Sequence, residues 1–231
     1  MNRRQFTQYS ALFLIAGNVP LMAHALSLNE LSNKDATAGL KLALDKGASA
    51  AVALLGAQDG FLGNDRVRIP LPGYLNDAAG LLRTLGQGRQ VDELLTAMNR
   101  GAEAAVPKAK ALLTRAVQAM TVDDAKGILA GGQTAVTDFF ASKTRSGLGV
   151  EFLPIVTQAT SKLGLAEKYN QVAGRGAELG LVKKEDANIQ QYVTTKALDG
   201  LYWMIGEEEK KIRQNPVGYG SALLTKVFGA L

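Results

Sequence analysis

The chain has 231 residues, with 26 lysines and arginines against 21 aspartates and glutamates, one histidine and no cysteine. Its single histidine, His24, falls within the first 25 residues, so the remainder has neither an imidazole nor a thiol group. This excludes disulfides, cysteine nucleophiles, Ser-His-Asp triads and the usual zinc, copper and iron–sulfur sites from the rest of the chain. We therefore expect no bound metal and no cofactor. We also expect no nucleic-acid partner, because the basic residues are spread along the chain instead of forming a patch or stripe.

Residues 1–25 have the three parts of a secretory signal peptide. Arg3 and Arg4 form the positive start, an apolar run over 11–22 follows, and residues 23–25 (AHA) form a small-x-small cleavage site. The run is too short for a spanning helix, and no later apolar run is long enough, so we expect no transmembrane segment. We expect export of the mature chain. The arginine pair also fits a twin-arginine signal, and both export routes stay open.

The mature part, residues 26–231, is predicted to be one all-α domain. Apolar residues at helical spacing predict helices over residues 33–55, 73–85, 90–120, 133–145, 150–163, 165–179, 184–214 and 219–229. Pro107 must kink the 90–120 segment or start a new helix, and Thr121 is suited to cap the next one. Alternating strand patterns are nearly absent, so we expect a single-domain multi-helix bundle.

One stretch near the first predicted helix is not helical in pattern. Residues 56–72 (GAQDGFLGNDRVRIPLP) are rich in glycine, aspartate, asparagine and proline, and they predict an extended loop. Asp59, Asn64 and Asp65 offer oxygen atoms that suit calcium. Their spacing does not match an EF-hand, and such residues beside glycine usually bond to their own backbone in turns.

The stretch GILAGGQT, residues 127–134, resembles a phosphate-binding P-loop that has Gln133 in place of the lysine. A P-loop follows a buried strand, whereas this stretch follows a predicted helix start that carries acidic residues. We therefore interpret it as a helix end, with Gly131 and Gly132 in left-handed geometry and Gly127 placed for a close helix approach. Other glycines within helical stretches also predict close approach of a helix or a ligand groove: Gly39, Gly47, Gly101, Gly174, Gly176 and Gly200.

A candidate polar cluster lies on the predicted 90–120 helix. Asn99 and Glu103 are four residues apart and share a helix face. If this face points inward, Asp124 and Thr137 are candidates to meet it, while Arg100 is placed on a different side from the positions that best suit Glu103. The cluster would then fix the helix register, bind a small polar ligand, or supply two carboxylates for hydrolysis.

Several stretches, taken in order, resemble a known family: DGFLGNDRVRIPLP, MNRGAEAAVPKAKALL, DDAKGILAGGQTAVTDFF, FLPIV, KALDGLYWMIGEEEKKIRQNP and LLTKVFG. They are similar to a bacterial family of exported helical proteins that is defined as a domain of unknown function. The resemblance covers essentially the whole mature chain. It implies an all-α protein of the cell envelope, and it implies no established activity and no catalytic residue.

These observations favour a non-catalytic interaction or binding module of the periplasm. The 59–72 loop and the face with Asn99 and Glu103 are the first candidates for its binding surface, with an envelope protein or a small ligand as partner. Two alternatives stay open, namely a carrier of a lipid or other apolar ligand and a hydrolase that uses Glu103 and Asp124. Trp203, the only tryptophan of the chain, is expected in the core.

Overall fold

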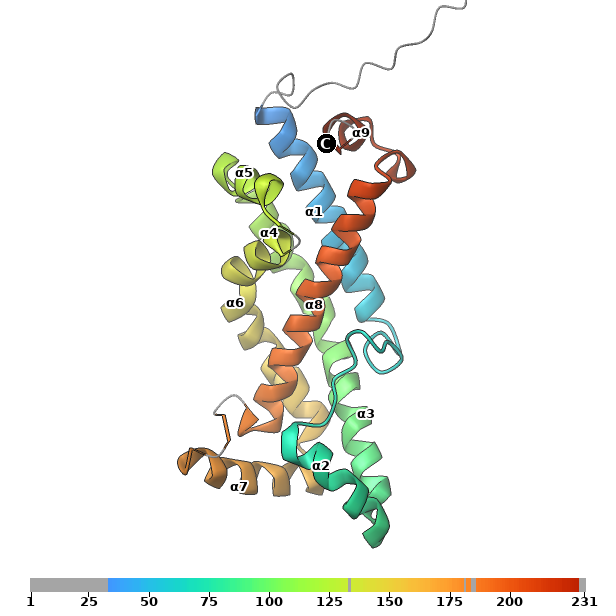
Figure 1. Cartoon of the computed structure of the whole chain (residues 1–231), viewed down its shortest axis with the longest axis vertical. Helices are drawn as coiled ribbons and strands as arrows, with labels where there is room; N and C mark the ends of the chain where they lie inside the picture. The colour runs from blue at the N-terminus through green and yellow to red at the C-terminus, as the bar shows by residue number, and fades with distance from the viewer. Residues whose placement is uncertain (1–32, 133, 181, 184–185, 229–231) are drawn as a thin grey trace, which may run out of the picture.

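The computed structural model describes residues 33–132, 134–180, 182–183 and 186–228. Over these residues the chain forms helices and connecting turns without any strand, and the helices make one elongated bundle (Figure 1). The all-α prediction is therefore confirmed. The predicted signal peptide, residues 1–25, lies outside the described residues. None of the helices described is both long enough and apolar enough to cross a bilayer.

Some of the helices run along the bundle and others lie at its two ends (Figure 1). The helices along the bundle are α1 (Asn33–Leu55), α3 (Gly88–Ala105), α4 (Ala109–Gln118), α6 (Ala135–Thr160) and α8 (Ile189–Gln214). One end carries α2 (Gly73–Leu82) and α7 (Gly164–Glu178), and the other carries α5 (Val122–Ala130) and α9 (Ala222–Phe228). Helix α8 packs against α1 and α6, and α6 also packs against α3.

The helix boundaries that depend on strong local signals are confirmed. Helix α1 covers the predicted 33–55 span. Pro107 lies in a short 3₁₀ turn that separates α3 from α4, because proline cannot donate the hydrogen bond that a continuous α-helix needs. Thr121 caps α5, since its Oγ1 accepts from Asp124 N at 3.0 Å while an Asp124 carboxylate oxygen accepts from Thr121 N at 2.9 Å.

The prediction of two helices over 133–145 and 150–163 is wrong. The chain forms the single helix α6, which continues through Pro154. Leu148, Phe152 and Val156 are fully buried on either side of the proline. Packing of this apolar face against α3 and α8 outweighs the backbone hydrogen bond that Pro154 removes.

The interpretation of GILAGGQT as a helix end is correct, but the predicted geometry is wrong. Gly131 ends α5 in an extended conformation (φ −78°, ψ 163°), not in the left-handed region. Glycine is needed there for space, because a Cβ would lie 2.5 Å from the Ala135 Cβ. A Cβ on Gly127 would meet nothing within 4 Å, so this glycine does not mark a close helix approach.

Three of the six glycines expected at close approaches face another helix. A Cβ on Gly101 would lie 3.1 Å from the Ala159 Cβ of α6, while Gly39 faces Val227 of α9 and Gly47 faces the backbone of α8. Gly200 of α8 faces the 56–72 loop, and a Cβ on Gly176 would lie 2.9 Å from the side chain of Val182, which follows α7. A Cβ on Gly174 would meet nothing within 4 Å.

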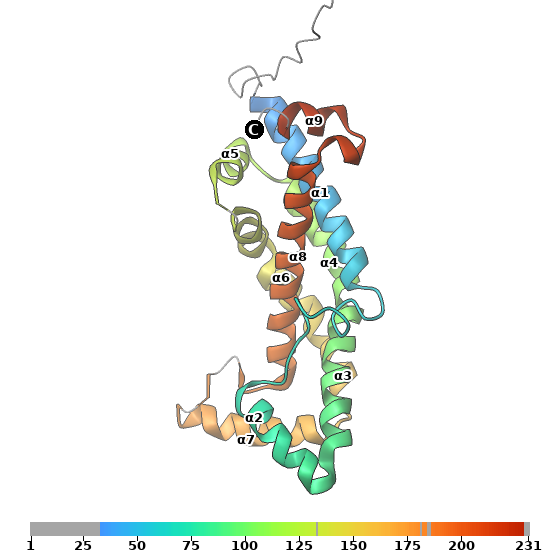
Figure 2. The ribbon, with the colours of Figure 1, turned by 45° about the vertical axis from the view of Figure 1, so that its right-hand side comes forward.

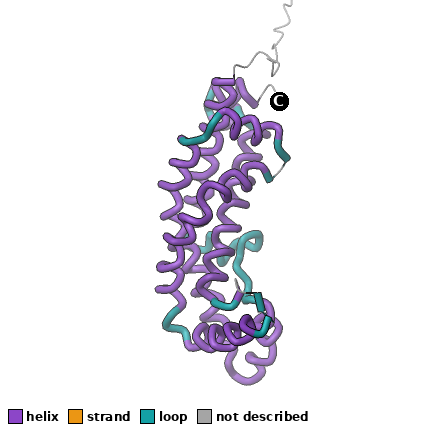
Figure 3. The backbone as a smooth tube through the Cα atoms, turned by 90° about the vertical axis from the view of Figure 1, so that its left-hand side faces the viewer, coloured by secondary structure: helices purple, strands orange, loops and turns teal. Residues whose placement is uncertain are grey.

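Residues 56–72 connect α1 to α2 and run along the outside of the bundle beside α3 and α8 (Figure 2; teal segment in Figure 3). The predicted extended loop is therefore confirmed. Its position brings it against α8 and against the face of α3 that carries Asn99 and Glu103.

Candidate ligand-binding site

Asn99 attaches the loop to α3. Its Oδ1 accepts a hydrogen bond from Ile69 N at 2.8 Å, and its Nδ2 donates to Ile69 O at 3.0 Å and to Leu95 O at 2.9 Å. Asn99 is fully buried. The side chain thus satisfies both backbone groups of an extended residue that has no neighbouring strand.

Glu103 attaches the loop at a second point, one helical turn further along α3. Its Oε1 accepts from Phe61 N at 3.1 Å and from Leu62 N at 3.0 Å. Its Oε2 accepts from Arg100, at 2.6 Å, and Arg100 also donates to Asp59 at 2.8 Å. The hydrogen bond with Glu103 raises the pKa of the Arg100 guanidinium above its ordinary value.

The loop also inserts apolar side chains against α8. Phe61 is fully buried, and a Cβ on Gly200 would lie 2.9 Å from its ring, so glycine at this position lets the ring approach the helix. Tyr192 donates its hydroxyl to Pro70 O at 3.2 Å. Burial of this hydroxyl, with Asp186 nearby, raises the pKa of Tyr192 to about 12.

Asp59 and Asn64, whose oxygen atoms would suit calcium, use these atoms in hydrogen bonds within the protein. Asp59 has a positive φ of 65° and accepts from Arg100. Asn64 Oδ1 accepts from Arg66 N at 3.1 Å, in the manner expected for an asparagine in a turn, and Asp65 is exposed. Over the residues described, no group of three or more acidic side chains is placed to hold a metal ion.

The expected meeting of Asp124 and Thr137 with the face of Asn99 and Glu103 does not occur. Asp124 bonds to Thr121 and lies 3.6 Å from the Lys143 ammonium, on α5 at the far end of the bundle from α2. Thr137 donates to Tyr202 O at 3.4 Å. The carboxylate pair that the hydrolase alternative requires is therefore not assembled, because α5 and α3 lie at different levels of the bundle.

Arg100 and Tyr192 help to attach the loop, but the predicted polar cluster does not include them. Arg100 was placed away from Glu103, and this is wrong, because the i, i+3 spacing brings the two side chains together on one helix face. That spacing was the signal that would have found the pair. Tyr192 carries no such signal, since it is 122 residues from Pro70 in the chain.

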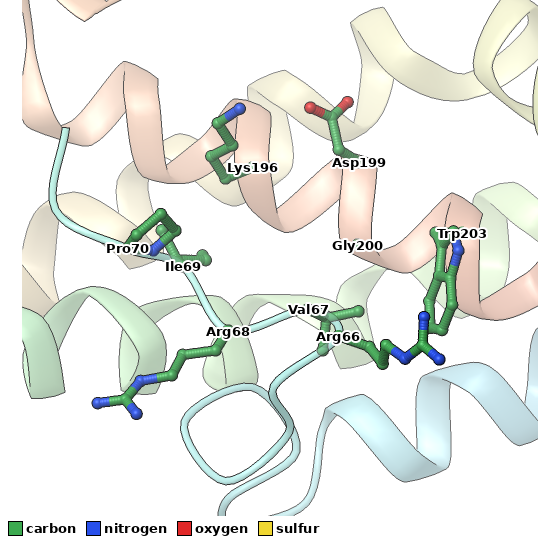
Figure 4. A pocket seen from close by; sticks show the side chains of 9 residues that line it. All are labelled: Arg66, Val67, Arg68, Ile69, Pro70, Lys196, Asp199, Gly200 and Trp203. Atoms are coloured by element: carbon green, nitrogen blue, oxygen red, sulfur yellow. The ribbon is translucent and has the colours of Figure 1, made fainter. Parts of the chain in front are cut away.

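A hollow of about 340 Å³ lies between the loop and α8 (Figure 4). The loop lines it with residues 66–70, and α8 lines it with Lys196, Asp199, Gly200 and Trp203. Trp203, which was expected in the core, is partly buried and packs against the edge of the core. The hollow is large enough for a small ligand.

A second hollow, of about 280 Å³, lies between α4 and α6 and is lined by Arg115, Met120 and Lys143 among others. Both hollows open to solvent, and neither is the long apolar cavity that a lipid carrier would need.

Comparison with known proteins gives a family but no activity. No curated protein and no solved structure matches the chain. A family model described as a protein of unknown function, DUF4197, matches residues 30–229 and therefore covers all of the described residues. The chain belongs to the DUF4197 family.

Proposed function

We propose that the protein is a binding module of the bacterial periplasm, and that it binds its ligand or partner at the surface formed by the 56–72 loop and α8. Residues 1–25 support the location, because their charged start, apolar run and small-x-small end are typical of export signals. The rigid attachment of an exposed loop supports the binding role.

The observation that best supports this proposal is that buried side chains of α3 hold the backbone of the 56–72 loop, while Arg66 and Arg68 of this loop are exposed. Asn99 and Glu103 are 0% and 5% exposed, and both bond to loop backbone. Placing a carboxylate and an amide in the interior is costly unless they make such bonds. The fixed loop then presents Arg66 and Arg68 to solvent beside the hollow. A surface held in one shape loses little entropy when a ligand binds.

The experiment is native mass spectrometry of the protein recovered from the periplasm of its own bacterium. We expect a retained ligand on the wild-type protein, and we expect its loss when Arg66→Trp and Lys196→Trp fill the hollow. Arg89→Trp and Lys126→Trp form the matched control, because both positions are exposed and neither lines the hollow. The intact mass also tests cleavage after Ala25.

An adduct that persists in the filled variant would contradict the proposed surface. Absence of any adduct on the wild-type protein would contradict the binding role, and a chain that retains residues 1–25 or stays in the cytoplasm would contradict the proposed location. Circular dichroism of each variant verifies that the helices are intact.

A further inference from the structure

We propose that the hollow beside α8 binds a small organic anion, whose phosphate or carboxylate group pairs with Arg66 while a planar apolar part lies against Trp203. This inference rests on the proposed function and names the chemical class of the ligand. A solvent-open hollow of about 340 Å³ suits a small molecule better than the extended surface of a nucleic acid or a membrane.

The charge of the hollow favours an anion. Arg66, Arg68 and Lys196 line it, against one carboxylate, Asp199. That carboxylate already accepts from Arg145 at 2.7 Å, which leaves it little attraction for the other cations. Within the part of the chain that the structure describes, neither Arg66 nor Arg68 makes an ion pair with a carboxylate. An arginine without an internal partner can give its planar set of donors to an oxyanion.

The floor of the hollow is apolar. Val67 and Ile69 are buried on the loop side, and Trp203 supplies an indole on the α8 side. Figure 4 shows Arg66 and Arg68 leaving the loop in opposite directions, with Arg66 directed toward Trp203. An anionic group at Arg66 would therefore have an aromatic surface beside it, which favours a ligand with a planar apolar part.

The backbone that carries these arginines is fixed at almost every residue. Asn64 accepts from Arg66 N through its side chain and from Arg68 N through its carbonyl, at 3.1 and 2.8 Å. Ile69 is paired with Asn99, and Pro70 O accepts from Tyr192. Only the side chains of the arginines must become ordered when the anion binds, and this keeps the entropic cost of binding small.

Lys196 contributes less than Arg66 to the binding of the anion. The Lys196 ammonium lies 5.7 Å from the centre of the Tyr192 ring, a contact that holds the side chain near α8. In Figure 4, Lys196 and Trp203 stand apart along α8. Lys196 therefore adds long-range attraction for an anion, while Arg66 makes the direct contact.

The test uses the indole N–H signal of Trp203, which is the only tryptophan of the chain and so gives one assigned peak in a proton–nitrogen correlation spectrum. Three probes are titrated into the full mature protein: 1-naphthyl phosphate, neutral 1-naphthol and inorganic phosphate. We expect saturable shifts of the Trp203 signal with 1-naphthyl phosphate. Binding should be at least about tenfold weaker for 1-naphthol, which lacks the phosphate, and for inorganic phosphate, which lacks the ring.

Arg66→Gln should raise the Kd for 1-naphthyl phosphate about tenfold, the loss expected for one charge-assisted hydrogen bond. Lys196→Gln should raise this Kd about threefold. Arg89→Gln is the matched control, since this arginine is 87% exposed and does not line the hollow, and it should leave the Kd unchanged. Equal Kd values for naphthol and naphthyl phosphate, an unchanged Kd in Arg66→Gln, or no shift of the Trp203 signal would each overturn the proposal.

The two proposals fail separately. A neutral ligand retained in the native mass spectrum, with no binding of 1-naphthyl phosphate, would overturn this inference and support the binding module. Binding of 1-naphthyl phosphate as predicted, with no ligand retained from the periplasm, would support this inference and contradict the role in the cell.

Discussion

Asn99 pairs with both backbone groups of Ile69, as a residue of a neighbouring strand would: its Oδ1 accepts from Ile69 N at 2.8 Å and its Nδ2 donates to Ile69 O at 3.0 Å. One helical side chain thus replaces a missing strand. The loop that lines the candidate site depends on this pairing, because Ile69 lies at the centre of the segment that carries Arg68 and Pro70.

Asn99→Asp keeps the shape of the side chain but removes its donor and buries a charge. Ile69 O and Leu95 O would lose the hydrogen bonds that Nδ2 gives them. We expect the free energy of unfolding at pH 7 to fall by about 2–4 kcal/mol, the order expected for a buried charge and the unpaired carbonyl of Ile69. Urea denaturation monitored by circular dichroism measures it. A loss below about 0.5 kcal/mol would show that the amide donor is unimportant.

Glu103 is tested by comparing two substitutions. Glu103→Ala leaves the N–H groups of Phe61 and Leu62 without their acceptor, and we expect a loss of about 3 kcal/mol in the free energy of unfolding. Glu103→Gln keeps an acceptor at Oε1 and loses the ion pair and the hydrogen bond with Arg100, so about 1 kcal/mol is expected.

The ratio of the two losses distinguishes the roles of Glu103. If the glutamine variant is as unstable as the alanine variant, the charge and not the backbone contact holds the loop. The control is Ala104→Gln, which places the same amide side chain at the next, exposed position of α3. This variant should leave the free energy of unfolding unchanged within about 0.5 kcal/mol, because a surface substitution breaks no contact.

The sequence indicated much of this site, because the signals concerned are local. Asn99 and Glu103 stand four residues apart on an apolar stripe, and a polar pair in that position must find partners when the stripe is buried. The structure buries both residues and gives them partners in the loop. Asparagine, aspartate and glycine likewise identified the loop itself.

The partners of this pair were not predictable from local patterns. Asp124 and Thr137 were expected near Glu103, yet the partners are Phe61 and Leu62, which lie 42 and 41 residues earlier in the chain. A backbone N–H is present at every non-proline residue, so no sequence pattern marks the one that a carboxylate will choose. The hollow was missed for the same reason, since it depends on where the loop meets α8.

Gly200→Ala tests the contact between the loop and α8. The new Cβ would lie 2.9 Å from the Phe61 ring and 3.3 Å from the Val67 Cβ, and both of these side chains are buried and unable to move freely. We expect a loss of about 1–3 kcal/mol in the free energy of unfolding, as is typical of overpacking. Loosening of the loop should also increase hydrogen exchange at Phe61 and Ile69.

Gly149→Ala is the matched control for this substitution. Gly149 lies inside α6, and a Cβ there would meet nothing within 4 Å. Alanine stabilises a helix interior by about 1 kcal/mol relative to glycine. If both variants were stabilised alike, Gly200 would have no packing role against the loop.

The capping box of α5 predicts that the free energy of unfolding depends on pH in the acidic range. Backbone and side-chain hydrogen bonds from Thr121 lower the pKa of Asp124 below its ordinary 3.8. The carboxylate therefore binds fewer protons in the folded state than in the unfolded state, so its stabilising contribution is present above pH 3.8 and is lost as the pH falls below that value.

Asp124→Ala should cost about 1 kcal/mol of unfolding free energy near pH 6, and the difference from wild type should shrink below about pH 4. Asp123→Ala is the control, because it removes the same charge from the same helical turn without breaking the box. Equal losses for the two variants would assign the effect to the helix dipole instead of the cap.

Tyr192 predicts the opposite dependence, at alkaline pH. Burial raises the pKa of its hydroxyl from 10.0 to about 12, so between these values the folded protein keeps a proton that the unfolded chain releases. The contribution of Tyr192 is fully present below pH 10 and is lost as the pH rises toward 12. A phenolate also cannot donate to Pro70 O, so the loop should detach from α8 as the proton leaves.

We therefore expect the free energy of unfolding to fall between about pH 9.5 and about pH 11.5, and to fall less steeply in Tyr192→Phe, which has no proton to lose. Urea denaturation at steps across this range measures both slopes. Tyr202 remains in the variant, and since burial also raises its pKa, some slope should persist. Identical slopes in the two proteins would show that the Tyr192 hydroxyl is as free to ionise in the fold as in the unfolded chain.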